Sequence, residues 1–79
     1  MRLSIISLKG VEFDGDVNSL NLKTTSGEIT VLDNHRPLIT QLLEGEAIVT
    51  KEDGERLNFS IKSGFLEVGL NNQVTLLAG

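Results

Sequence analysis

The sequence from residue 57 to residue 70 reads LNFSIKSGFLEVGL, and its alternation decides the fold class. Apolar residues occupy every second position on both sides of the Ser63-Gly64 dipeptide, namely Leu57, Phe59, Ile61, Leu66, Val68 and Leu70. A period of two places one set of side chains on the buried face of a strand and the other set on its solvent face. This stretch therefore predicts two β-strands joined by a short turn.

The same period recurs along most of the chain. It appears in Leu20 with Leu22, Ile29 with Val31, Ile48 with Thr50, and Val74 with Leu76. The opening segment, residues 3–8, mixes apolar and serine residues and predicts a strand that is covered on both faces. We interpret all three phenylalanines as core residues.

Residues that tolerate a positive φ angle separate these segments at short intervals. They are Lys9-Gly10, Asp14-Gly15, Ser26-Gly27, Glu44-Gly45, Asp53-Gly54, Ser63-Gly64 and Asn71-Asn72. Asp53-Gly54 gives the strongest signal for a β-hairpin, because it stands between two predicted strands. Many short strands with frequent turns predict an all-β fold, a β-sandwich or flattened barrel.

One segment is open to two interpretations. Residues 33–37 could cap and begin a short helix with Pro37 in its first turn. They could equally form a loop that enters a strand in which Leu38, Thr40 and Leu42 alternate with their neighbours. We favour the strand.

Composition limits the function classes. The 79 residues suffice for a single domain, residues 1–79, and the chain has no cysteine. The net charge is −4, the seven Lys and Arg residues are dispersed, and Trp and Tyr are absent. Nucleic-acid binding needs clustered basic residues and stacking aromatics, so we reject it. No apolar run approaches the length of about 20 residues that spans a bilayer, so we expect a cytoplasmic protein.

The sequence offers no catalytic, cofactor or metal site. His35 is the only histidine, and neither a nucleophile motif nor a glycine-rich phosphate loop accompanies it. The loop that begins at Asp14 has oxygen ligands at its first positions, but Ser19 and Thr25 stand where a calcium loop needs Gly and Glu. A small hydrolase would require His35, Asp33 and Asp14 to converge. A β-sandwich that binds other proteins is the simpler interpretation.

Glu28 is the one surface residue that the pattern singles out. It follows the small polar tip Thr25-Ser26-Gly27 between two predicted strands. A lone glutamate there is usually only solvated, but loop tips on a rigid scaffold are also where binding residues gather.

Four segments taken in order resemble one family. They are Ser26–Leu32, Asn34–Thr40, Gly64–Val68 and Asn71–Ala78, and the Phe13-Asp14-Gly15 turn also fits. The chain resembles the N-terminal domain of the epsilon subunit of F-type ATP synthases over essentially its whole length.

This resemblance implies a flattened, ten-stranded β-sandwich that is not catalytic by itself. It also implies a place in the central stalk, with the gamma subunit and the membrane c-ring as partners, membrane contact only through the complex, and a monomer when isolated. By position, Ser26, Gly27 and Glu28 correspond to the loop that contacts the c-ring. His35, Pro37, Leu38 and Thr40 correspond to part of the gamma-facing surface.

The chain departs from the family pattern in a few places. Larger members carry a C-terminal helical hairpin after the sandwich, whereas this sequence stops at Gly79, as an excised domain or a naturally short epsilon would. Inhibition or nucleotide binding by that hairpin is therefore not assigned to these residues. Arg36 and Ser63 replace residues that are usually small, and Gln73 resembles a one-residue insertion in the last hairpin.

Overall fold

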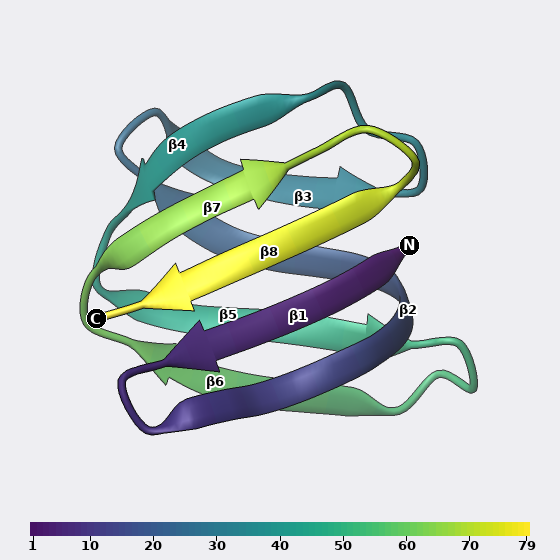
Figure 1. Cartoon of the computed structure of the whole chain (residues 1–79), viewed down its shortest axis with the longest axis horizontal. Helices are drawn as coiled ribbons and strands as arrows, with labels where there is room; N and C mark the ends of the chain where they lie inside the picture. The colour runs from purple at the N-terminus through teal and green to yellow at the C-terminus, as the bar shows by residue number, and fades with distance from the viewer.

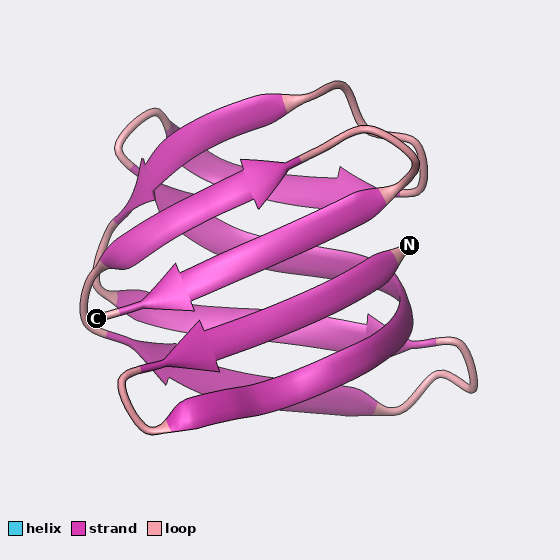
Figure 2. Ribbon diagram, viewed as in Figure 1, coloured by secondary structure: helices cyan, strands magenta, loops and turns pink.

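Eight β-strands joined by short loops make up the protein, and its computed structural model describes residues 1–79 (Figures 1 and 2). The strands are β1 (Arg2–Ser7), β2 (Gly10–Thr24), β3 (Gly27–Leu32), β4 (Leu38–Leu42), β5 (Gly45–Lys51), β6 (Arg56–Ile61), β7 (Gly64–Val68) and β8 (Gln73–Ala78). The all-β sandwich prediction is confirmed. Residues 38–42 form the strand that we favoured over a helix, and no helix of a length and apolarity that could span a membrane is present.

The strands form two layers. In Figure 1 the front layer holds β4, β7, β8, β1 and the first half of β2, and the back layer holds β3, the second half of β2, β5 and β6. The long strand β2 passes from one layer to the other, so that it pairs with β1 through Gly10–Asp16 and with β3 through Ser19–Thr24. The resemblance implied ten strands, whereas the structure has eight. The continuous passage of the 15-residue strand β2 through both layers accounts for one strand of this difference.

Strand pairing fixes which residues share a face. β1 and β8 pair in parallel, with Leu3 beside Val74 and Ile5 beside Leu76, whereas the other pairs are antiparallel. In β2 the register against β5 shifts between Val17 and Ser19, at the point where the strand bends towards the back layer. A β-bulge of this kind increases the local twist and bends the strand.

One hydrophobic core lies between the layers. Its fifteen members are Met1, Leu3, Ile5, Val17, Leu20, Leu22, Val31, Leu42, Ala47, Val49, Ile61, Leu66, Val68, Val74 and Leu76. Phe13 and Phe59 pack against this cluster and meet edge to face, with ring centroids 6.0 Å apart. Burial of apolar area in this core is the main force that holds the two layers together.

Four predicted features differ from the structure. Phe65 is 53% exposed and Leu70 is 74% exposed, because Phe65 points outward from β7 and Leu70 lies in the β7–β8 turn. In β5 the buried residues are Ala47 and Val49, so Ile48 lies on the outer face. β1 is fully buried on one face only, since on its other face Arg2 is exposed and Ser4 and Ile6 are half-buried.

Two turns favour glycine because of their backbone geometry, at Gly54 and at Gly64. At the predicted hairpin, Gly54 has a φ of 91° and donates its N–H to the Lys51 carbonyl at 2.9 Å. Gly64, at the start of β7, has a φ of 147°, and a Cβ atom built there would lie 2.0 Å from the Leu77 carbonyl oxygen. A side chain at Gly64 would therefore separate β7 from β8.

Neighbouring leucines of β8 provide a test of this packing. Leu76→Ala should destabilise the protein by about 2–5 kcal/mol, because Leu76 is fully buried and its truncation leaves a cavity. Leu77→Ala should cost about 1 kcal/mol or less, since Leu77 is 47% exposed on the outer face. Denaturant unfolding of both variants measures the difference, and equal losses would contradict the assigned register.

Candidate partner-binding surfaces

The polar tip between β2 and β3 is held by hydrogen bonds beneath it. Thr24, the only buried polar residue, donates its hydroxyl to the Gly27 carbonyl at 2.8 Å and accepts from the Ser26 N–H at 3.0 Å. Gly27 has a φ of 115°, which favours glycine. The Thr25 N–H donates to the Gln41 carbonyl at 3.0 Å, so the tip is also fixed to β4. The tip is therefore a structured turn whose Ser26, Gly27 and Glu28 are all exposed.

Glu28 has its own partners at the start of β3. Its carboxylate accepts a hydrogen bond from the Asn21 side-chain amide at 3.2 Å, and it lies opposite Lys23 in the β2–β3 register. Asn21 also donates to the Thr30 hydroxyl at 2.9 Å. These contacts orient the carboxylate while leaving it open to a partner.

The structure separates the four residues predicted for the gamma-facing surface into a loop pair and a strand pair. His35 and Pro37 lie in the β3–β4 loop, at the opposite end of β3 from the Ser26–Glu28 tip (Figure 1). His35 is partly buried and its Nδ1 atom is 2.9 Å from the Arg36 carbonyl oxygen, whereas Pro37 is exposed. Leu38 and Thr40 are half-buried because they share the inward side of β4 with Leu42.

The outward side of β4 carries residues that sequence reasoning missed. Ile39 is 72% exposed, and Gln41 is exposed beside it. The signal was present in the sequence, because in a strand with Leu42 buried the odd positions must face out. The family pattern therefore selects Leu38 and Thr40 of β4, whereas exposure selects Ile39 and Gln41 of the same strand.

Ile39 belongs to a larger apolar patch on the outer face of the front layer. We define this apolar patch by Ile6, Val11, Ile39, Phe65 and Leu77. Cross-strand pairs connect Val11 to Ile6, Ile6 to Leu77, and Leu77 to Phe65. On the adjoining strand β4, Ile39 is paired with Glu67 and lies diagonally from Phe65. Four of the five side chains are between 47% and 72% exposed, and Ile6 is half-buried.

The outer face of the back layer is mainly polar. Its central positions include Ser19, Asn21, Thr30 and Asn58, with Ile48 and Leu32 as the apolar exceptions. Asn58 donates its side-chain amide to Glu46 at 2.9 Å, in the same way that Asn21 binds Glu28. The outer face of the front layer also carries polar residues, among them Ser4, Asp14, Glu67 and Thr75, so the two faces differ by the apolar patch at one end of the front layer.

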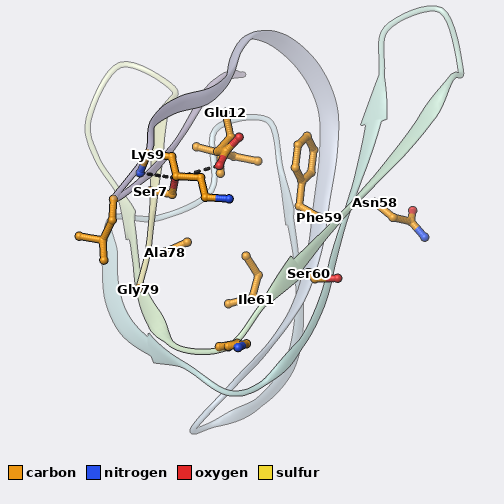
Figure 3. Close-up of a pocket in the computed structure, with 12 residues that line it drawn as sticks. Ser7, Lys9, Glu12, Asn58, Phe59, Ser60, Ile61, Ala78 and Gly79 are labelled. Atoms are coloured by element: carbon orange, nitrogen blue, oxygen red, sulfur yellow. Dashed lines mark hydrogen bonds between the residues drawn. The ribbon is translucent and has the colours of Figure 1, made fainter.

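A groove opens where the β1–β2 hairpin faces the free edge of β6 (Figure 3). Its volume is about 560 Å³, and its walls include Leu8, Phe59 and Ile61. Ser7 donates its hydroxyl to Glu12 at 2.8 Å and accepts from the Lys9 N–H at 3.1 Å. No group of three or more His, Cys, Asp or Glu side chains is arranged to hold a metal ion.

The three residues that a hydrolase would need are engaged separately. Asp14 accepts hydrogen bonds from Arg2 at 3.0 Å and from Ser4 at 3.3 Å, and the Arg2 hydrogen bond holds the pKa of the Asp14 carboxyl below its usual value. Asp33 binds the amino group of Met1 instead, and His35 contacts the Arg36 carbonyl.

Comparison with known proteins identifies the family. Residues 1–79 match the family described as ATP synthase, Delta/Epsilon chain, beta-sandwich domain. The chain is 40% identical over 78 residues to the ATP synthase epsilon chain of Roseiflexus sp. (strain RS-1), covering 99% of this chain and 55% of that one. It is also 40% identical over 76 residues to the epsilon chain of Endomicrobium trichonymphae, covering 96% and 54%. The protein belongs to the delta/epsilon β-sandwich family, and it spans about half the length of these relatives.

Solved structures show the same fold. A chain in the cryo-EM structure of the Euglena gracilis mitochondrial ATP synthase, OSCP/F1/c-ring, matches with a TM-score of 0.90 and 25% identity, over 96% of this chain and 48% of that one. A chain in the central stalk/c-ring structure of the Tetrahymena thermophila enzyme matches with a TM-score of 0.80 at 14% identity, over 99% and 62%. The second match supports the fold alone.

Lowering the pH should remove the stability contributed by the ion pair between Asp33 and the Met1 amino group. The hydrogen bond from that amino group lowers the pKa of Asp33, and the hydrogen bond from Asn72 lowers it further. A lowered folded-state pKa contributes stability above the unfolded value of about 3.9, and this contribution is lost as the pH falls through the folded value. Between about pH 5 and pH 2 the parent chain should therefore lose more stability than Asp33→Asn. The loss is measured as the change in the denaturant midpoint of each protein across this pH range. Equal losses in the parent chain and in Asp33→Asn would contradict the assigned ion pair.

Proposed function

We propose that this chain is a non-catalytic rotor subunit in the central stalk of an F-type ATP synthase. It joins the gamma subunit to the membrane c-ring, so that ion translocation through the ring is coupled to ATP synthesis elsewhere in the complex. In this proposal residues 1–79 form a single domain that is a monomer when isolated. The domain is peripheral, on the cytoplasmic face of a bacterial inner membrane, which it contacts only through the complex.

The observation that carries the proposal is the difference between the two outer faces in a chain of this family. Contiguous apolar side chains exposed on one face mark a docking surface, because leaving them in water is unfavourable. Within the apolar patch, the paired side chains of Val11, Ile6, Leu77 and Phe65 have this character, whereas the outer face of the back layer presents mainly polar and charged groups. A stable interface buries at least about 1,000 Å² in total, which is compatible with a whole sheet face.

The gamma-facing surface in this proposal combines the β3–β4 loop with the apolar patch. His35 and Pro37 contribute from the loop, while Leu38 and Thr40 support β4 from inside. Ile39 would make the direct contact from β4, because its side chain points outward and is 72% exposed. The patch then extends this contact across β7, β8 and β1.

The ring-facing surface is the tip formed by Ser26, Gly27 and Glu28. Its small polar residues suit the polar loops of a membrane ring, and Thr24 holds the turn rigid from below. Because the tip and the β3–β4 loop lie at opposite ends of β3, a force applied at one is carried to the other through paired strands. A stiff connection of this kind allows two partners to turn as one body.

Glu28→Lys should weaken attachment to the c-ring while the isolated domain stays folded. The substitution reverses the exposed charge and places a second lysine opposite Lys23, which costs at most about 1 kcal/mol of stability. Glu28→Gln is the matched control, because it keeps an acceptor for Asn21. Retention of the chain on membranes that carry the assembled ring measures the effect. Normal coupling in membranes with Glu28→Lys would count against the assignment.

Phe65→Asp should weaken binding to the gamma subunit without unfolding the domain. Phe65 lies in the apolar patch, so a carboxylate there would lose its hydration on docking. Thr30→Asp is the control on the polar outer face, where Asp can still accept the hydrogen bond from Asn21. Calorimetric titration with the gamma subunit should show a loss of about tenfold or more for Phe65→Asp only. Equal affinities for the two variants would place the interface elsewhere.

A further inference from the structure

The side chain of Asn72 connects two loops that are far apart in sequence. It lies in the β7–β8 turn, where its Oδ1 atom accepts the Asn34 N–H at 2.8 Å and its Nδ2 atom donates to the Asp33 carboxylate at 3.3 Å. Both polar ends of this one amide are therefore used on the β3–β4 loop. Apart from these bonds, the loop backbone has the bond from the His35 N–H to the Leu32 carbonyl, at 3.2 Å.

Asn72 and its partners are themselves fixed to the sandwich. The Arg2 N–H donates to the Asn72 carbonyl at 3.0 Å, which ties the turn to β1. Asp33 also accepts from the buried amino group of Met1, which in turn donates to the Val17 carbonyl at 2.9 Å. We call the contacts of Asn72 with Asp33 and Asn34 the loop clasp. Through the loop clasp, the β3–β4 loop is anchored to the β7–β8 turn and, by the Arg2–Asn72 bond, to β1. The Asp33–Met1 pair separately ties the loop to β2.

The geometry points to Asn72 as a positioning residue for the gamma-binding loop, an inference that rests on the function proposed above. His35 and Pro37 follow the clasped residues directly, so the clasp sets where they lie before any partner arrives. A loop that is already ordered loses less conformational entropy on binding, which strengthens the complex. Asn72 touches no partner in this scheme; it acts through the loop.

The chain contains a matched control for testing this role. Asn71 and Asn72 have φ angles of 61° and 60°, so Gly can replace either one without backbone strain. Only Asn72→Gly removes the clasp, because no side-chain hydrogen bond involves Asn71. The entropic cost of a new glycine is common to both variants.

Two measurements on these variants separate positioning from plain stability. In the free protein, amide hydrogen exchange at Asn34 should be about fivefold faster in Asn72→Gly than in Asn71→Gly, as expected for one lost hydrogen bond. Affinity for the gamma subunit should fall by a similar factor in Asn72→Gly only, while Glu28-dependent attachment to the c-ring stays unchanged. A merely structural loss would move both binding activities together.

Other results of these experiments would contradict either the role of Asn72 or the proposed function. Equal Asn34 exchange in Asn71→Gly and Asn72→Gly would show that the clasp does not order the loop. Faster exchange with unchanged gamma affinity would remove Asn72 from the binding reaction. Failure of the unaltered chain to bind gamma would overturn the proposed function itself.

Discussion

The passage of β2 from one layer to the other is the constraint on which the rest of the structure depends. Its first half completes the front layer beside β1, and its second half stands between β3 and β5 in the back layer. Val17, Leu20 and Leu22 lie in or after the bend and are all buried. The loops before β4, β5 and β7 also cross between the layers, but β2 crosses as a strand. One continuous strand joins them through backbone that is hydrogen-bonded in both layers.

This arrangement leaves the loops at the two ends free to differ in chemistry without loss of the core. The Ser26–Glu28 tip and the β3–β4 loop share no side-chain contact, yet each is held by buried or bridging groups: Thr24 in the first case and Asn72 in the second. Interaction surfaces are thus presented in fixed positions by a scaffold whose own stability comes from the interior. The contrast between the apolar patch and the polar back face follows from the same strand alternation that builds the core.

The sequence predicted the fold class well where alternation was unambiguous. The segments around Asp53-Gly54 and Ser63-Gly64 gave correct strands because turn residues and apolar period agreed. Prediction failed at Ile48, since Ala47, Ile48 and Val49 are all apolar and only the pairing with β2 decides which points inward. Leu38 and Thr40 were selected by family position, whereas exposure favours Ile39. The link from Asn72 to Asp33 spans 39 residues and left no local signal.

The parallel pairing of β1 with β8 has a consequence for biosynthesis. β1 lies between β2 and β8 and is synthesised well before β8, so one of its two edges lacks a partner until residues 73–78 have appeared. Contacts between the two ends of a chain slow folding, because the intervening segment must be closed into a loop first. During translation the edge of β1 is a site for mispairing with other nascent chains. Closure of the front layer must therefore wait for residues 73–78, and chaperone binding to β1 until then would protect this edge.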